Sequence, residues 1–456
     1  MSLGPAPEAD GTRRVRVVVL NYNGGDHVLQ CIEALERTEW PSESLELVVV
    51  DNASVDGSVE EIERRFERVR VIRKPENTGF PANNVAMRDL DDLDYVALIN
   101  NDAFVQPGWL APLVTALDAD PELGAACPRI LFAPRFVEVT IETPTFRAPG
   151  DGRDLGVRVS GVEVDGKDAL ELAQLHEGLW GFEHGDADEP RFTWSAGRAV
   201  LRVPIDADHV DPIDVRVRLA AEAAKAVTVS SEGVSVAETV DATPRWVRFT
   251  VAGPGFDVIN NAGSELVTLG FGADRGFEQR DRGQFDEPAD VFAWCGGGVV
   301  LRRSYLEQVG LFDERFFLYY EDTDLAWRGR AQGWRYRYIP DSVVRHLHAA
   351  SSGEGSPLFQ HYVERNRLLM LLKNAPAPLV ANALYRYLRM MASFLVRAGI
   401  SAGRHRRRPD LGIVRRRAKS LAAAVRLTPA MLADRRALRR QQVVPDAELV
   451  AWMVRR

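Results

Sequence analysis

The sequence predicts an α/β protein with a Rossmann-like, mostly parallel sheet, an inserted antiparallel β-sandwich and a helical, basic C-terminal region. Three observations predict this fold. Apolar runs alternate with helix-spaced segments over residues 15–132, short alternating segments broken by Gly, Pro and Asp fill residues 133–256, and the last hundred residues are arginine-rich with helical spacing. A length of 456 residues allows at least two domains, each with its own hydrophobic core.

Four apolar runs predict strands that are buried on both faces: Val15–Leu20, Leu45–Val50, Val69–Ile72 and Tyr95–Ile99. Segments with helical spacing separate them, and Ser58 followed by Glu61 indicates a capping box at the start of the second helix. This order is typical of parallel βαβ units.

The α/β texture returns after residue 256, so the β-sandwich is predicted to be an insertion. The expected organisation is a disordered N-terminus (1–14), a first α/β half (15–132), the inserted β-sandwich (133–256), a second α/β half (257–355) and a helical C-terminal region (356–456).

The net charge of −8 is unevenly distributed. Residues 351–456 contain 21 Lys and Arg against 6 Asp and Glu, a local charge of +15, which leaves −23 for residues 1–350. An acidic body argues against nucleic-acid binding, whereas the basic region, with patches at Arg404–Arg408 and Arg415–Lys419, suits phospholipid headgroups or a lipid-linked phosphate.

The N-terminal residues lack the apolar run of a secretory leader, and no apolar run reaches the length of a membrane-spanning helix. The three cysteines, Cys31, Cys127 and Cys295, are far apart, which argues against a disulfide framework or a structural zinc site. We therefore expect a cytoplasmic protein, peripheral at the cytoplasmic face of the membrane.

Polar residues follow three of the predicted strands. They are Asn21-Tyr22-Asn23, Asp51-Asn52-Ala53-Ser54 and Asn100-Asn101-Asp102. Ligands of open parallel sheets bind at the carboxyl ends of the strands, so three such clusters favour a binding site, although each alone is commonly a turn or helix cap. Asp51 can accept the imide N–H of uracil or thymine, and Asp102 can ligate Mg²⁺ or Mn²⁺ on a diphosphate.

A second acidic cluster, Glu321, Asp322 and Asp324, follows an aromatic run. These acids either stabilise a helix N-terminus or place a general base at an open cleft, and the window alone favours neither. His346 is either a hydrogen-bonded polar residue or a metal ligand. The segment Trp294–Gly298 either allows a ligand to approach the backbone or forms a tight turn.

Together these windows resemble the family 2 inverting glycosyltransferases of the GT-A fold. The resemblance extends over residues 15–132 and 257–375, and within the family it points to bacterial rhamnosyl- and galactofuranosyltransferase-like enzymes of cell-surface polysaccharide assembly. The segments that carry it are Val17–Asn23, Val50–Ser54, Asn77–Asn84, Asn100–Asp102, Trp294–Gly298 and Gly310–Asp324.

The resemblance implies a role for each matching residue. Asp102 and His346 would hold a divalent metal, Mn²⁺ or Mg²⁺, although Asn100 stands where the family's Asp-x-Asp motif has its first acid. Asp322 would be the catalytic base, supported by Glu321 and Asp324. The acceptor side would include Trp294, Gly296 and Gly297. The nucleotide-sugar pocket would include Asn21, Tyr22, Asp51, Asn77, Gly79, Asn83, Asn100 and Asn101.

The implied activity is inverting transfer of a sugar, rhamnose or galactofuranose by analogy, from a UDP- or dTDP-linked donor to a hydroxyl of a glycan or lipid-linked acceptor. One alternative is a sugar nucleotidylyltransferase, but Asn23-Gly24-Gly25-Asp26 is a poor version of its glycine-rich, basic phosphate loop. Another is a non-catalytic glycan-binding protein, which the presence of Asp51, Asp102 and Asp322 disfavours.

The predicted insertion matches nothing in the common catalytic core. Its aromatic residues Trp180, Phe182, Trp194 and Trp246 either belong to the core of the β-sandwich or form a platform on which sugars stack. We expect the insertion to position an acceptor glycan or a partner.

Overall fold

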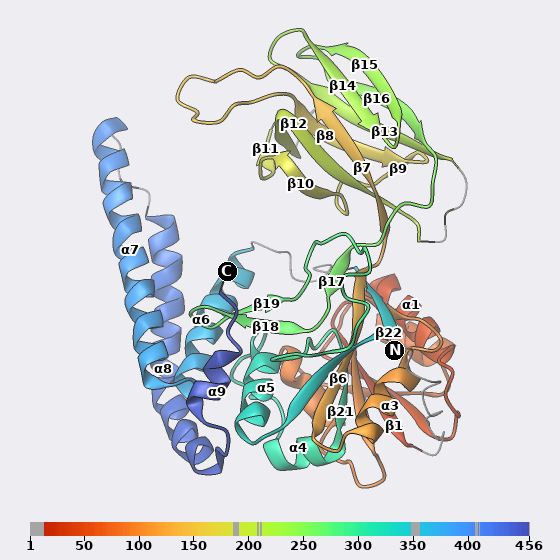
Figure 1. Cartoon of the computed structure of the whole chain (residues 1–456), viewed down its shortest axis with the longest axis vertical. Helices are drawn as coiled ribbons and strands as arrows, with labels where there is room; N and C mark the ends of the chain where they lie inside the picture. Colours follow the sequence, from red (N-terminus) through yellow and green to blue (C-terminus); the bar gives the residue numbers. More distant parts are fainter. Residues whose placement is uncertain are drawn as a thin grey trace. The chain divides into compact units, whose positions relative to one another are not determined.

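The computed structural model describes residues 13–455 except for 186–190, 208, 210, 211, 348–355, 406–408 and 410. Most of the predicted disordered N-terminus and Arg406–Arg408 of the first basic patch therefore lie outside the described residues. The chain forms two compact units (Figure 1). One consists of the residues up to Leu131 and from Ile259 onward, and the other of Phe132–Val258.

Four strands form the parallel part of the sheet in the first unit: β1 (Val15–Asn21), β2 (Leu45–Asp51), β3 (Val69–Arg73) and β4 (Tyr95–Asn100), in the order β4-β1-β2-β3. The register pairs Asn21 with Asp51 and Leu20 with Asn100. The predicted polar strand ends therefore lie at one edge of the sheet.

The helices of this half are α1 (Gly25–Glu36), α2 (Ser58–Arg65), the 3₁₀ helix η1 (Phe80–Ala86) and α3 (Leu110–Ala119). The predicted capping box is wrong, because Gly57 is the N-cap of α2 and Ser58 is its first residue. The Ser58 hydroxyl donates to Asp56 at 2.6 Å and accepts a hydrogen bond from Asn21 at 2.9 Å. It links two loops instead of capping its own helix.

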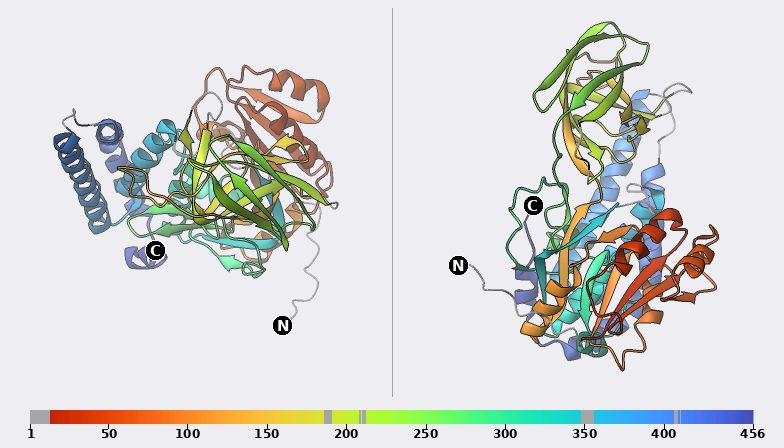
Figure 2. Two further views of the ribbon diagram at one scale, coloured as in Figure 1. Left: turned by 90° about the horizontal axis from the view of Figure 1, so that it is seen from above. Right: turned by 90° about the vertical axis from the view of Figure 1, so that its right-hand side faces the viewer.

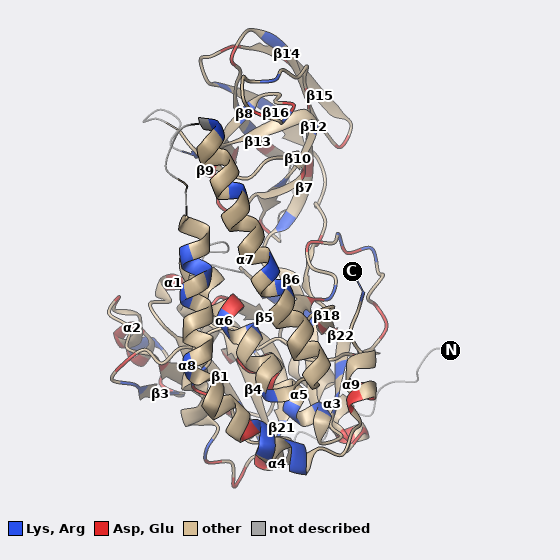
Figure 3. Cartoon of the chain, turned by 90° about the vertical axis from the view of Figure 1, so that its left-hand side faces the viewer, with Lys and Arg blue, Asp and Glu red and all other residues tan. Residues whose placement is uncertain are grey.

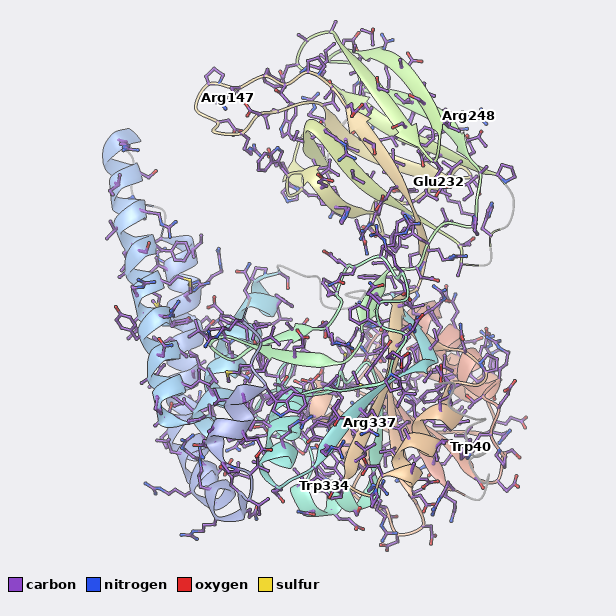
Figure 4. The ribbon with its side chains drawn as sticks, viewed as in Figure 1. Trp40, Arg147, Glu232, Arg248, Trp334 and Arg337 are labelled. Carbon is purple, nitrogen blue, oxygen red and sulfur yellow. The ribbon has the colours of Figure 1, made fainter. Side chains whose placement is uncertain are left out.

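The remaining strands make the sheet mixed. β21 lies antiparallel between β4 and β6, and β22 pairs antiparallel with β5 and β20. In β22, Arg337 (labelled in Figure 4) bonds Asp290 of β20 at 2.9 Å. The strands are β5 (Ala103–Val105), β6 (Leu123–Phe132), β17 (Ile259–Asn261), β20 (Ala289–Asp290), β21 (Gly298–Arg302) and β22 (Arg335–His346), with a separate ribbon of β18 (Ser264–Val267) and β19 (Phe271–Asp274).

Hydrophobic cores cover both faces of this sheet. Figure 2 shows the ribbon of the chain from two further sides. Val17 and Val19 of β1 pack with α1 and α3, whereas Val18 packs in the core that includes α4 (Arg303–Val309) and α5 (Glu321–Ala331). Successive side chains of a strand point to opposite faces, so the continuous apolar run that predicted β1 reflects burial on both sides.

The second unit is the predicted antiparallel insertion. Its main strands follow the path β15-β14-β7-β12-β8-β13-β16, and β15 also contacts β16, which makes the sandwich barrel-like. The strands are β7 (Arg135–Glu142), β8 (Arg158–Val164), β9 (Lys167–Asp168), β10 (Gln174–Leu179), β11 (Glu183–His184), β12 (Arg191–Ile205), β13 (Ile213–Ala220), β14 (Lys225–Ser231), β15 (Val234–Val240) and β16 (Arg245–Val251).

Alternating residues of these strands, such as Val215, Val217 and Leu219, build a core of the insertion's own. Trp194 is buried among aromatic neighbours, whereas Trp180 and Trp246 are 37% and 44% exposed. Only the latter two tryptophans remain candidates for a sugar-stacking surface.

The C-terminal region is helical, as predicted. It consists of α6 (Pro357–Asn374), α7 (Ala377–His405), α8 (Gly412–Gln441) and α9 (Asp446–Ala451). None of the helices in the described part of the chain combines the length and hydropathy of a membrane-spanning segment.

The insertion is expected to be removable. Leu131 and Ile259, which flank it, are partners in the pairing of β6 with β17. Replacing Phe132–Val258 by a short Gly-Ser link should therefore leave the first unit folded, since closing a short loop costs little and the insertion has a separate core. We expect cooperative thermal unfolding by circular dichroism, with a Tm within about 5 °C of the full chain. A shortened chain without a cooperative transition would contradict this expectation.

Candidate active site

Asn21 and Asp51 hold together the loops that follow β1 and β2. Asn21 is fully buried, and its Nδ2 donates to the Ser54 hydroxyl at 3.2 Å while its Oδ1 accepts from Gly24 N–H at 3.2 Å. Asp51, 3% exposed, accepts the Ser54 N–H at 3.2 Å. Tyr22 lies beside them and is 44% exposed. Asn21 is thus a scaffold residue, and Tyr22 is the more accessible of the predicted pocket residues.

The loop from Asn77 to Gly79 is organised by Asn52, a residue that the sequence interpretation did not select. Asn52 Nδ2 donates to Asn77 Oδ1 at 2.8 Å and to the Gly79 carbonyl at 3.1 Å, and its Oδ1 accepts from Thr78 N–H. The signal for Asn52 was its position directly after Asp51 at a strand end. Buried amides of this kind satisfy backbone groups that water cannot reach.

Gly79 brings this loop against the acidic segment. Its φ is +74°, and a Cβ there would lie 1.8 Å from the Phe317 carbonyl oxygen, so no other residue fits. Phe80 N–H donates to that same oxygen at 2.7 Å. Asn83 lies further along η1, is 1% exposed, and donates to the Phe80 carbonyl at 3.0 Å.

The structure brings the predicted metal ligands together, although they are 244 residues apart. His346 Nε2 lies 3.0 Å from Asp102 Oδ1 and 3.3 Å from Asn100 Nδ2. His346 Nδ1 lies 3.2 Å from Oδ1 of Asn260, a second residue that the sequence interpretation missed. Burial acts to raise the pKa of Asp102, but the hydrogen bond and charge of His346 outweigh it and hold that pKa below its usual value. Asn101 is partly exposed beside them.

These side chains suit a divalent cation. Two electron-pair donors at 3.0 Å need a proton or a cation between them, and one carboxylate with one imidazole leaves coordination positions for substrate phosphates. The Asn260 oxygen at Nδ1 fixes the imidazole ring, as outer hydrogen bonds do for metal-binding histidines. Within the described ranges, no group of three or more His, Cys, Asp and Glu side chains gathers as a protein-only metal cage.

Asp322, at the start of α5, is the one member of the acidic cluster that is partly exposed. Its Oδ1 accepts from Thr323 N–H at 2.6 Å and its Oδ2 from Gly296 N–H at 3.3 Å. Burial raises the pKa of Asp322 and outweighs these hydrogen bonds, which lower it. A carboxylate with a raised pKa is a stronger base, which suits proton abstraction from a hydroxyl.

The other two acids are buried in different environments. Glu321 is 4% exposed, its Oε2 has no hydrogen-bond partner among the described residues, and burial raises its pKa well above the usual value. Asp324 is fully buried and accepts from Arg328, Lys373 and Asn374 at 2.9, 2.9 and 2.8 Å. Burial opposes ionisation of Asp324, but Lys373 and Arg328 hold its pKa below the usual value. Asp324 therefore anchors α5 to α6.

Trp294, which was predicted on the acceptor side, has a buried side chain. Trp294 is fully buried and packs edge-to-face on Phe312, with ring centroids 6.1 Å apart. The glycines beside it permit close packing: a Cβ on Gly296 would lie 2.6 Å from the Phe80 ring. Gly296 N–H bonds Asp322, and the Gly297 carbonyl accepts from Asn100 N–H at 3.2 Å. This segment therefore connects the acidic helix with the Asp102–His346 pair.

The loop that precedes α5 and positions Asp322 has a strained backbone. Phe317, Tyr319 and Tyr320 have φ values of 67°, 68° and 70°, a conformation that costs a non-glycine residue roughly 1–3 kcal/mol. Asn366 of α6 offsets this cost, because its Nδ2 donates to the carbonyls of Phe316, Leu318 and Tyr319 at 2.8, 2.7 and 2.7 Å. In the sequence, Asn366 is marked only as an uncharged polar residue two positions before the apolar run Leu368–Leu372.

A mixed, mostly parallel sheet with helices on both faces, extended by C-terminal helices, is the fold expected of a GT-A glycosyltransferase. Two family models match the chain: Glycosyl transferase family 2 over residues 16–147 and Glycosyl transferase family group 2 over residues 267–395. The chain belongs to glycosyltransferase family 2, which confirms the predicted fold class and the resemblance.

Two curated relatives are similar over short stretches. The chain is 45% identical over 69 residues to an N-acetylglucosaminyl-diphospho-decaprenol L-rhamnosyltransferase of Mycobacterium tuberculosis, which is 15% of this chain and 22% of the relative. It is 26% identical over 97 residues to a poly(ribitol-phosphate) beta-glucosyltransferase of Bacillus spizizenii, 20% of this chain and 15% of the relative. The matched stretches thus span less than a quarter of these relatives.

Solved structures of three glycosyltransferases align with most of the chain at low similarity. GalNAc-T7 with UDP, GalNAc and Mn²⁺ has a TM-score of 0.41 and 13% identity over 80% of this chain and 48% of its own. The mannosyltransferase PcManGT from Pyrobaculum calidifontis, in complex with GDP-Man and Mn²⁺, has a TM-score of 0.39 and 16% identity over 93% of this chain and 90% of its own. S. aureus TarS 1–349 has a TM-score of 0.40 and 12% identity over 96% of this chain and 88% of its own.

Lys373 is expected to be essential for stability. K373M would remove the cation that Asp324 and Asp313 share, which bonds them at 2.9 and 2.7 Å, and would leave Asp324 with Arg328 and Asp313 with Arg315. We expect a loss of about 3 kcal/mol in the free energy of unfolding, measured by urea denaturation. K419M, at an exposed lysine of α8, is the matched control and should change stability by less than about 0.5 kcal/mol. Equal stability of the two variants would refute the role of this ion pair.

Proposed function

We propose that this chain is an inverting glycosyltransferase that moves a sugar from a nucleotide-diphosphate sugar to a hydroxyl of a glycan or lipid-linked acceptor, with Asp322 as general base. The observation that carries the proposal is the connection of the partly exposed Asp322 carboxylate, through Gly296, Gly297 and Asn100, to the Asp102–His346 pair. A base and a cation-binding pair at one sheet edge are the two elements that this transfer requires.

The arrangement of Asp322 suits proton transfer from the acceptor. Its oxygens are oriented by the Thr323 and Gly296 N–H groups, and its partial burial favours accepting a proton. Burial raises the pKa of the neighbouring Glu321 well above its usual value, which favours the neutral form of Glu321. A divalent cation held by Asp102 and His346 would supply positive charge for the departing nucleotide diphosphate.

For the donor, Asp51 and Tyr22 would meet the base and nucleoside, which suits UDP or dTDP. The relative named as an N-acetylglucosaminyl-diphospho-decaprenol L-rhamnosyltransferase supports a rhamnosyl donor and a lipid-diphosphate acceptor in cell-wall polysaccharide synthesis. Such an acceptor would place the enzyme at the cytoplasmic face of the membrane, where its basic C-terminal helices meet anionic headgroups.

For the insertion, we propose a role in positioning the acceptor glycan or a partner. The exposed Trp180 and Trp246 support this, because aromatic faces stack on sugar rings. The chain without Phe132–Val258 should keep turnover on a small soluble acceptor and show a raised KM for the full acceptor glycan. An unchanged acceptor KM and unchanged assembly would end this proposal.

Replacement of the base tests the reaction itself. Asp322→Asn should lower kcat by at least ~100-fold with nucleotide affinity unchanged, because the amide cannot accept the hydroxyl proton. In the wild-type enzyme, kcat/KM should fall as the pH decreases through the raised pKa of Asp322, since only the ionised carboxylate is a base. Asp341→Asn, at an exposed acid of β22, is the matched control. Unchanged turnover of the Asp322 variant would refute the assignment of the base.

Nucleotide and metal binding are separately measurable by thermal shift with UDP, dTDP, GDP and ADP, each with Mn²⁺, Mg²⁺ or EDTA. We expect metal-dependent stabilisation by UDP or dTDP, about 2.7 kcal/mol at a hundred times Kd. Asp102→Asn and His346→Ala should remove the metal dependence, whereas His184→Ala, an exposed histidine of the insertion, should not. Stabilisation by no nucleotide would favour the non-catalytic glycan-binding alternative.

A further inference from the structure

Helix α7 exposes an apolar stripe that the fold does not use. Tyr385, Leu388, Leu395, Val396 and Ile400 are 62%, 54%, 47%, 60% and 52% exposed. At 100° per residue these positions fall within one broad side of the helix: 388 and 395 are seven residues apart, 385 and 396 eleven, and 396 and 400 four. A large apolar stripe left in water marks an interaction surface.

A different side of α7 already makes the intramolecular contacts. Ala383 and Tyr387 are 1% and 2% exposed, and the Tyr387 hydroxyl donates to Glu364 of α6 and to the Arg417 carbonyl of α8. The helix is therefore apolar on two sides, one packed against its neighbours and one exposed.

Basic side chains border the exposed apolar stripe of α7, and Arg389 lies within its arc. Arg386, Arg389, Arg397 and Arg404 are exposed, and residues 377–405 contain no Asp or Glu. Figure 3 shows this helix in tan and blue. The neighbouring α8 has one acid, Asp434, which pairs with Arg315. The stripe is thus bordered by arginines without carboxylates on the same helix.

These charges decide what covers the stripe. A second copy docked through α7 would bring arginines near arginines without an acid of this helix to compensate. An anionic leaflet offers acyl chains to the apolar residues and phosphates to the arginines, whose stems extend along the interface. We infer that α7 lies in the plane of an anionic membrane surface with Tyr385, Leu388, Leu395, Val396 and Ile400 inserted at the acyl boundary.

This inference deepens the proposed function and rests on it in one respect: membrane binding is useful to the enzyme if its acceptor is lipid-linked. The physical argument for insertion depends on α7 alone. Attraction of the basic region alone would be fully screened by salt, whereas insertion of apolar side chains persists at high salt. The two components can therefore be separated.

Vesicle binding of the full chain tests the insertion. The variant L388S/L395S/I400S is compared with V55S/V234S/V443S, which replaces three exposed valines that are not part of α7 and have exposures of 90%, 37% and 71%. Vesicles of phosphatidylglycerol and phosphatidylcholine are used at about 0.1 and about 0.5 M NaCl. The stripe variant should lose at least ~10-fold in partitioning at both salt concentrations, and the control less than ~2-fold.

A second measurement reports depth directly. V396W should show a blue-shifted emission on these vesicles and quenching by brominated lipid chains. Equal partitioning of the stripe and control variants, or an emission unchanged by vesicles, would overturn the inference. A dimer that only the stripe variant dissociates, with vesicle binding unchanged, would assign the stripe to a second copy instead.

Failure of this inference is distinguishable from failure of the proposed function. The stripe variant should keep its circular dichroism spectrum and its turnover on a water-soluble acceptor, and Asp322→Asn should bind vesicles as the wild type does. A variant that loses turnover but still binds vesicles has a defect in the active site. A variant that loses vesicle binding but keeps turnover on the water-soluble acceptor has a defect in α7.

Discussion

The hydrogen bonds from α6 to the loop before α5 are the interaction on which the rest of the site depends. Phe317, Tyr319 and Tyr320 of this loop have left-handed backbone conformations. The side-chain amide of Asn366 donates hydrogen bonds to carbonyls of the same loop. About two turns further along α6, Lys373 bonds the buried Asp324 in the first turn of α5. The loop is thus held at its backbone and the helix at a charged side chain. The C-terminal helices are part of the catalytic unit for this reason.

Close backbone contacts connect this loop with the loops that follow the parallel strands. Gly79 allows its loop to touch the Phe317 carbonyl, and Gly296 allows the Phe80 ring to approach the segment that bonds Asp322. A side chain at either glycine would push the two halves of the site apart. The polar strand ends and the acidic helix therefore meet through backbone contacts, with few side chains between them.

The sequence was sufficient for features that depend on local pattern. Continuous apolar runs predicted β1 to β4, and the topology of a parallel sheet placed Asp51 and Asn100 at one edge. The meeting of Asp102 with His346 required the family resemblance. Features that depend on tertiary partners were not predictable: Trp294 packs in the core, Asp324 pairs with Lys373 and Arg328, and Ser58 bonds another loop where a capping box was predicted. The importance of Asn52, Asn260 and Asn366 is visible only from the backbone groups that they satisfy.

The position of the insertion has a consequence for synthesis of the chain. β4 ends at Asn100, but its second neighbour β21 begins only at Gly298, after the whole insertion. A ribosome therefore completes the barrel-like unit while one edge of the parallel sheet still lacks its partner strand. An unpaired edge is prone to join other chains. Because the insertion has a core of its own, it can fold before β21 emerges, and the unpaired edge is exposed during that interval.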